Sequence, residues 1–159
     1  WPHMLEDIRK MVQECDVCSR CKHENVACLG LLQPLPVPQY SWSHVTMDFI
    51  EGLPKSEGKN VIMVVVDRLT KYSYFQSLSH PISAVGVAKL FLHDVCKLHG
   101  IPQSIVSDRD KAFTSQFWQE LFRFLGSKLH FSSAYHPQSD GQSERVNQCV
   151  EMYWRCMAH

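Results

Sequence analysis

The stretch that decides the fold is His44-Val45-Thr46-Met47-Asp48-Phe49-Ile50. Its residues alternate, with Val45, Met47 and Phe49 on one face of an extended chain and Thr46 and Asp48 on the other. This period of two predicts a β-strand over residues 44–50. Asp48 lies inside this largely apolar strand, where an ionised side chain is costly unless it is paired or bound to a metal. The position therefore calls for a chemical reason.

The segments around this strand predict an α/β domain. Residues 61–66 are apolar on both faces and residues 72–78 are rich in aromatic side chains, so both are predicted strands that form an antiparallel meander with the first. Helical spacing of apolar residues, caps and glycine stops then predict a helix, a strand, a helix, a strand and a helix, over residues 83–99, 104–107, 114–125, 128–132 and 139–157. This order predicts a mixed five-stranded sheet with helices on both faces.

The chain divides into three parts by composition. Residues 1–30 are rich in Cys, residues 31–41 form a Pro-rich linker, and residues 42–159 form the main domain. The length of 159 residues suits one such domain. Because the chain starts without Met and stops inside a predicted helix, we expect it to be a fragment of a longer polypeptide.

The charge balance is neutral, with 16 Lys plus Arg against 16 Asp plus Glu. A protein that coats nucleic acid through charge alone is strongly basic, so this balance argues weakly against DNA as a partner. Divalent cations held by some of the acids would reverse the sign locally. No apolar run approaches the length of a membrane helix, so we expect no membrane partner.

Two further acids belong with Asp48. Asp108 follows a short predicted strand, at the end where open α/β sheets bind ligands, and Glu144 lies in the first turns of the last predicted helix. If the two strands are neighbours, Asp48 and Asp108 face one crevice. Carboxylates are the ligands that Mg²⁺ and Mn²⁺ prefer, and two such ions catalyse displacement at phosphorus. The alternative is that these three acids have no catalytic role and are a helix cap, a turn Asp and a solvated Glu. Four other acids, Asp67, Asp94, Asp110 and Asp140, are interpreted as a strand end, a helix surface, a cap and a turn.

The motifs resemble those of retroviral and retrotransposon integrases. Asp108 and Glu144 are separated by 35 residues and, with Asp48 upstream, match the D,D(35)E pattern of that family. The surrounding strings resemble gypsy-type LTR-retrotransposon integrases in particular. They are Met47-Asp48-Phe49-Ile50-Glu51-Gly52-Leu53-Pro54, Val66-Asp67-Arg68-Leu69-Thr70-Lys71, Leu98-His99-Gly100-Ile101-Pro102, Ser107-Asp108-Arg109-Asp110 with Phe113-Thr114-Ser115, and the run from Tyr135 to Arg145.

The resemblance implies an RNase H-like fold and a two-metal polynucleotidyl transferase that integrates DNA. Carried over by position, Asp48 would bridge two Mg²⁺ or Mn²⁺ ions, Asp108 would complete one site and Glu144 the other. The enzyme would process the 3′ ends of retroelement DNA and transfer them into target DNA. It would act in the nucleus, after a cytoplasmic particle stage, as a homo-oligomer.

The first 30 residues resemble the end of the family's zinc-binding domain. Trp1-Pro2 resembles the tail of its Tyr-Trp-Pro segment, and Cys15 with Cys18 the Cys pair of its His-His-Cys-Cys site. The two His ligands lie upstream in the family, so this pair is half of a tetrahedral site. Cys21 and Cys28 complete four thiolates by count, but the spacing packs three of them closely. We expect Zn²⁺ only in the longer parent protein.

Ten residues are candidate DNA contacts. Four are basic residues near the acids or their flanking motifs, three lie in the loop before the last helix, and three are amides on that helix: Lys71, Arg109, Lys111, Arg145, Tyr135, His136, Gln138, Gln142, Asn147 and Gln148. Solvated surface charges, a plain connector and an ordinary polar helix face would have the same composition.

Two other functions are open. One is a catalytically silent or domesticated DNA- or chromatin-binding module derived from an integrase. The other is an RNase H-like nuclease that hydrolyses DNA or RNA without joining the ends. Joined product in the presence of a 3′-hydroxyl donor separates the nuclease from the integrase.

Overall fold

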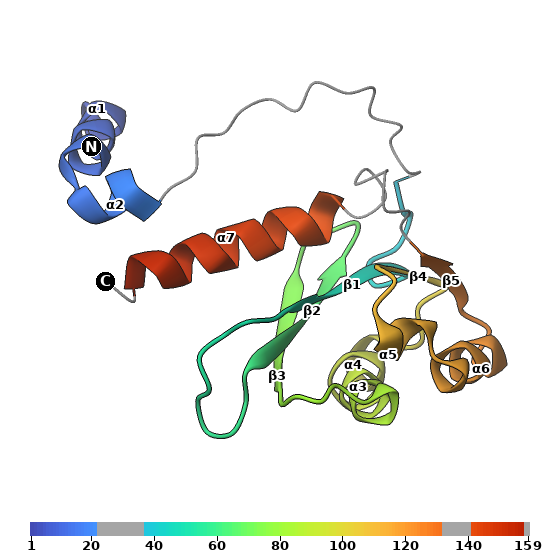
Figure 1. The fold of residues 1–159 in the computed structure, drawn as a ribbon. Coiled ribbons are helices and arrows are strands. Elements are labelled where there is room, and N and C mark those ends of the chain that lie inside the picture. The colour runs from blue at the N-terminus through green and yellow to red at the C-terminus, as the bar shows by residue number, and fades with distance from the viewer. Residues whose placement is uncertain (22–36, 132–140, 158–159) are drawn as a thin grey trace. The chain divides into compact units, whose positions relative to one another are not determined.

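The structure is a computed structural model that describes residues 1–21, 37–131 and 141–157, with the backbone alone at 18, 19, 21, 141–145, 155 and 157. It divides into two compact units, residues 1–31 with 147–159 and residues 32–146. The first holds the short helices α1 (Met4–Glu14) and α2 (Asp16–Cys21) together with most of α7 (Gly141–Met157) (Figure 1). In the described ranges, no helix is long and apolar enough to cross a bilayer.

The second unit is built on a five-stranded sheet in the order β3-β2-β1-β4-β5. Its strands are β1 (His44–Ile50), β2 (Val61–Asp67), β3 (Ser73–Leu78), β4 (Ser104–Ser107) and β5 (Lys128–Phe131). The first three form the predicted antiparallel meander, and β4 and β5 add to β1 in parallel. The predicted mixed five-stranded sheet with helices is therefore confirmed.

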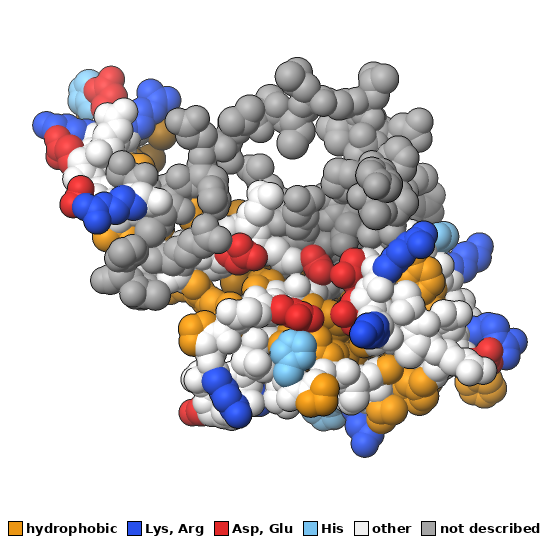
Figure 2. Space-filling view, viewed as in Figure 1, with side chains coloured by type: hydrophobic (Ala, Val, Ile, Leu, Met, Phe, Trp, Pro, Cys, Tyr) orange, Lys and Arg blue, Asp and Glu red, His pale blue; other side chains and the backbone are white. Residues whose placement is uncertain are grey.

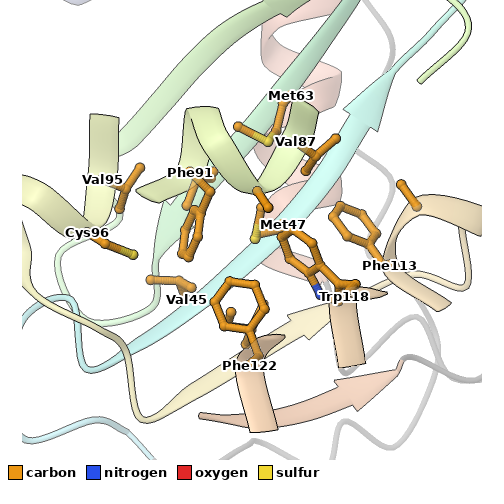
Figure 3. Packing of buried hydrophobic residues seen from close by; sticks show 14 residues of the cluster. Val45, Met47, Met63, Val87, Phe91, Val95, Cys96, Phe113, Trp118 and Phe122 are labelled. Atoms are coloured by element: carbon orange, nitrogen blue, oxygen red, sulfur yellow. The ribbon is translucent and has the colours of Figure 1, made fainter. Parts of the chain in front are cut away.

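The helices α3 (Ala84–Phe91), α5 (Lys111–Thr114) and α6 (Gln116–Phe124) cover one face of this sheet (Figure 1). Val45 and Met47 of β1 pack there against Phe122 and Trp118 of α6, all of them fully buried (Figure 3). The Trp118 and Phe122 rings lie 4.5 Å apart between centroids, an ordinary aromatic packing distance. Alternation therefore sends Thr46 and Asp48 to the opposite face of β1.

Two predicted helices differ in detail. The helix predicted over residues 83–99 begins after its predicted cap, Ser83, whose side chain accepts from the Gly86 amide. It is interrupted by the π-helical turn η1 (Leu92–Cys96) before α4 (Lys97–His99). The helix predicted over residues 114–125 was wrong at its start. Ser115 is extended and its hydroxyl caps α6 at the Trp118 amide, so Thr114 ends the separate helix α5.

Candidate active site

Two of the three predicted acids are brought together by the pairing of β1 with β4. These strands run parallel, with Thr46 opposite Val106 and Met47 opposite Ser107. The next residue on each strand is Asp48 and Asp108, so the register sets their Cα atoms about 5 Å apart. Because side chains alternate along a strand, Asp48 lies on the same face as Thr46, and Asp108 on the same face as Val106. This is the sheet face opposite the core formed with α3 and α6.

Asp48 is a half-buried residue near the end of β1. Its Oδ1 accepts a hydrogen bond of 2.8 Å from the amide of Phe49, the next residue. The Phe49 ring turns to the other face and stacks on Phe113 of α5 at 4.7 Å between centroids. The strand is thus anchored by packing on one side while it presents a carboxylate on the other.

Asp108 follows β4 directly and is also half-buried. Burial is the main reason that the pKa of its carboxyl lies above the usual range. The Asp110 amide, which donates to Oδ1 at 3.1 Å, opposes this rise, and the negative charges of Asp110 and Glu51 add to it. Asp108 therefore sits among other carboxylates, an environment that a bound cation would relieve.

Glu51 and His80 are neighbours of this site that the sequence interpretation did not single out. Glu51 acts on Asp108 through its charge, and its Oε2 lies 3.3 Å from Nε2 of His80. Figure 2 shows acidic side chains gathered on this face, with Lys or Arg side chains beside them. The feature of the sequence that could have pointed to Glu51 is its position within the string from Met47 to Pro54.

The third acid, Glu144, lies in the first turn of α7, and only its backbone is described. Among the side chains that the structure describes, no group of three His, Cys, Asp or Glu is arranged as a metal site. Asp48 and Asp108 are the two acids of the predicted triad whose side chains are described, and their carboxylate oxygens are suitable ligands for a hard divalent cation.

The candidate DNA contacts are only partly described. Arg109 and Lys111 are exposed and flank Asp108 along the chain. Lys71 lies beyond the end of β2, which is antiparallel to β1, and is therefore at the opposite end of β1 from Asp48. Gln148 is exposed and Asn147 is buried, whereas the side chains of Gln142 and Arg145 and the residues Tyr135, His136 and Gln138 lie outside the description.

The predicted zinc half-site lies in the first unit. Cys15 is the residue between α1 and α2 and is partly buried. The Cys18 side chain and the whole of Cys28 lie outside the described part of the chain. The structure therefore leaves the zinc expectation as a prediction.

Asp67 ends β2, as predicted, but it is not an ordinary acid. It is fully buried, and its two carboxylate oxygens accept from the Trp42 amide at 2.9 Å, the Thr70 amide at 3.0 Å and the Thr70 hydroxyl at 2.6 Å. These hydrogen bonds outweigh the effect of burial and hold the pKa of Asp67 below its usual range. This acid has a structural role in the turn after β2.

The sequence relationship agrees with this arrangement. Residues 40–137 match the integrase core domain family. The chain belongs to that family. This integrase core domain is also 38% identical, over 157 residues, to the Transposon Tf2-3 and Tf2-4 polyproteins of Schizosaccharomyces pombe (strain 972 / ATCC 24843). The match covers 99% of this chain, which spans 12% of the length of those relatives.

Solved integrases share the fold of this integrase core domain. The catalytic core domain of BIV integrase has a TM-score of 0.55 at 23% identity, over 69% of this chain and 67% of that one. The HTLV-2 integrase catalytic core domain, solved with magnesium as a dimer, has a TM-score of 0.56 at 20% identity, over 71% and 70%. A simian T-cell lymphotropic virus intasome bound to PP2A regulatory subunit B56 gamma has a TM-score of 0.60 at 19% identity, over 89% of this chain and 49% of that one.

Proposed function

We propose that this integrase core domain catalyses DNA integration, by processing the 3′ ends of a retroelement and joining them to target DNA. The observation that carries the proposal is the pairing of β1 with β4, which sets Asp48 and Asp108 on one face of the sheet at adjacent positions. The family membership supports a polynucleotidyl transferase, and the motif that ends in Glu144 supplies the third acid.

Asp48, Asp108 and Glu144 are the proposed ligands of two Mg²⁺ or Mn²⁺ ions. The pKa of Asp108 is raised first by burial and then by the charges of Asp110 and Glu51, and this supports a cation here because a positive charge stabilises a carboxylate that is buried among other carboxylates. When bound, two such ions stabilise negative charge on the attacking and leaving oxygens of a displacement at phosphorus. The magnesium present in the HTLV-2 integrase structure is consistent with this choice of metal.

The proposed reaction has two displacements. In the first, water attacks a phosphodiester near the end of the element DNA, and the bond to the 3′ oxygen breaks to leave a free 3′ hydroxyl. In the second, that hydroxyl attacks a target phosphodiester, so one P–O bond forms as another breaks and the target strand is released with its own 3′ hydroxyl. Arg109 and Lys111, exposed beside Asp108, are placed to contact the phosphates of either DNA.

The other parts of the proposal concern assembly and location. Joining two element ends to one target requires more than one active site, so we propose a homo-oligomer that acts in the nucleus. The dimeric HTLV-2 core and the simian viral intasome support an oligomer. Lys71, Gln142, Arg145, Asn147, Gln148, Tyr135, His136 and Gln138 stay proposed DNA contacts, and Cys15 with Cys18 a proposed zinc half-site of the longer protein.

The test is a strand-transfer and disintegration assay with labelled DNA in Mn²⁺. Asp48→Asn and Asp108→Asn should each lower the rate of joining at least about a hundredfold, because each removes a charged ligand at the reacting phosphorus. Asp94→Asn, an acid on η1 paired with His93, is the control and should keep the parent rate. Hydrolysis without joined product in the parent would identify the nuclease instead. DNA affinity with no reaction at all, unchanged in Asp48→Asn, would identify the binding module.

A further inference from the structure

A cavity of about 910 Å³ opens at the end of the sheet where β1, β4 and β5 begin. Its walls include His44 of β1, Ser104 of β4, and Lys128 and His130 of β5, with Arg68 from the turn after β2. This volume is in the range of small-molecule sites in proteins. None of the residues that line it is part of the proposed carboxylate site.

The strand register groups the basic side chains of this cavity. His44 lies opposite Ser104, and Ser104 opposite Lys128, so these three residues form one row across the sheet. His130 lies two residues further along β5 and therefore on the same face. The imidazole Nδ1 of His44 lies 2.5 Å from the Ser104 hydroxyl, which ties the first two residues of the row together.

Arg68 brings a buried positive charge to the same place. The residue is 8% exposed, and its amide donates to the His44 carbonyl at 3.0 Å. Burial first, and then the charges of Arg68 and His130, hold the pKa of His44 below its usual range. The positive groups are thus close enough to act on one another electrostatically.

The charge in this cavity is of one sign among the described residues that line it. They include Arg68, Lys128 and two His, and no Asp or Glu. Several basic groups gathered in one cavity attract an anion by their combined charge and hydrogen-bond donors. The remaining walls include Tyr40 and Val106, which offer aromatic and apolar surface next to the charges.

We propose that this cavity binds a nucleotide, with the phosphate against Lys128, His130, His44 and Arg68 and the base against Tyr40 and Val106. Phosphate suits a cluster of Lys, Arg and His donors, and a base can stack on an aromatic side chain such as Tyr40. The nucleotide has two possible sources, a free mononucleotide or a residue of a DNA strand, which share this chemistry.

The site is separate from the carboxylates although it occupies the same sheet face. His44 and Asp48 are four positions apart along an extended strand, a distance of about 13 Å. Thr46 and Val106, both buried, lie in the row between them. The inference does not rest on the proposed reaction, because binding here requires neither divalent metal nor an intact Asp48.

The test is a titration of the ¹³C-labelled His side chains by NMR, with the whole chain in EDTA. The probes are dAMP, deoxyadenosine, inorganic phosphate and a short single-stranded DNA. Saturable shifts of His44 and His130 with dAMP, at least about tenfold weaker with deoxyadenosine, are expected, since the phosphate provides charge-assisted hydrogen bonds. Inorganic phosphate should compete with dAMP.

The variant Lys128→Gln should weaken dAMP binding about tenfold. Lys128 is an exposed edge-strand residue, so its replacement should leave the fold intact, which the resonances of the buried core will show. Lys97→Gln, an exposed lysine at α4, is the matched control and should change binding less than about twofold.

The DNA arm identifies the source of the nucleotide. DNA that binds more tightly than dAMP, and loses affinity in Lys128→Gln but not in Lys97→Gln, assigns the cavity to a strand; equal or weaker binding assigns it to the free nucleotide. The proposal is overturned if no probe shifts His44 and His130 at millimolar concentration, if deoxyadenosine binds as well as dAMP, or if the two lysine variants behave alike.

Discussion

Replacement of the buried acid Asp67 by alanine should destabilise the fold by about 3 kcal/mol. Its carboxylate accepts three hydrogen bonds of 3.0 Å or shorter, two from Thr70 and one from Trp42, and a fourth from Leu69 at 3.4 Å that is too long to add much. A hydrogen bond to a charged group contributes about 1.5 kcal/mol at the low end, so the three bonds together contribute about 4.5 kcal/mol. The alanine variant recovers part of this free energy because it no longer buries a carboxylate, which leaves a loss of about 3 kcal/mol.

The variant Asp67→Asn removes the negative charge of the side chain while keeping its shape, so it measures the contribution of the charge. An amide keeps one acceptor oxygen for Trp42, but its NH₂ group meets the two Thr70 donors, so a loss of about 2 kcal/mol is expected. Trp42 keeps its hydrogen bond in this variant, and with it the support for its left-handed φ of 61°, so this part of the Asp67→Ala cost is absent. The control is Asp94, a partly exposed acid paired with the exposed His93, and Asp94→Asn should change stability by less than about 0.5 kcal/mol.

The measurement is urea unfolding, followed by Trp fluorescence, across pH. The folded pKa of Asp67 lies below the unfolded value of about 3.9, so its contribution is complete above that value and is lost as pH falls through the folded pKa. The gap between parent and Asp67→Asn should therefore be constant from neutral pH down to about pH 4 and narrow below it. Equal stability of the two proteins near neutral pH, or a gap that persists in strong acid, would refute the charged hydrogen-bond account.

Three other predictions address the core, a helix cap and two charges. Phe122→Ala should cost about 3–5 kcal/mol in urea unfolding, because the ring is fully buried among aromatic neighbours. Ser115→Ala should cost about 1 kcal/mol by removing the cap of α6, with Ser56→Ala, an exposed serine in the β1–β2 connection, as a neutral control. Glu51→Gln should lower the pKa of Asp108, since the Glu51 charge raises it, and a carboxyl ¹³C titration that shows no decrease would contradict this electrostatic interaction.

A cysteine prediction completes the set: burial raises the pKa of the Cys96 thiol to about 11, so Cys96 should alkylate far more slowly than the exposed Cys149 in the folded chain, as peptide mass spectrometry would show.

Local patterns in the sequence were sufficient for most of the fold. The alternation over His44–Ile50 and the apolar run from Val61 predicted two strands at their observed places, because side-chain period reports backbone conformation directly. The break between α5 and α6 was missed, because Ser115 is compatible with a helix interior by composition and acts here as a cap. Nothing in the apolar spacing distinguishes these two uses of a serine.

The sequence by itself determined the strand that carries Asp48, the order of elements and the spacing of the acids, since all of these are properties of the chain read locally. Tertiary structure decided which strand lies beside β1, and hence that Asp108 is the neighbour of Asp48. It also decided that Asp67 is a buried anchor and that His44 and Lys128 share one row. The physical reason is that strand pairing depends on burial between residues that are distant along the chain, and a local period contains no information about the partner strand.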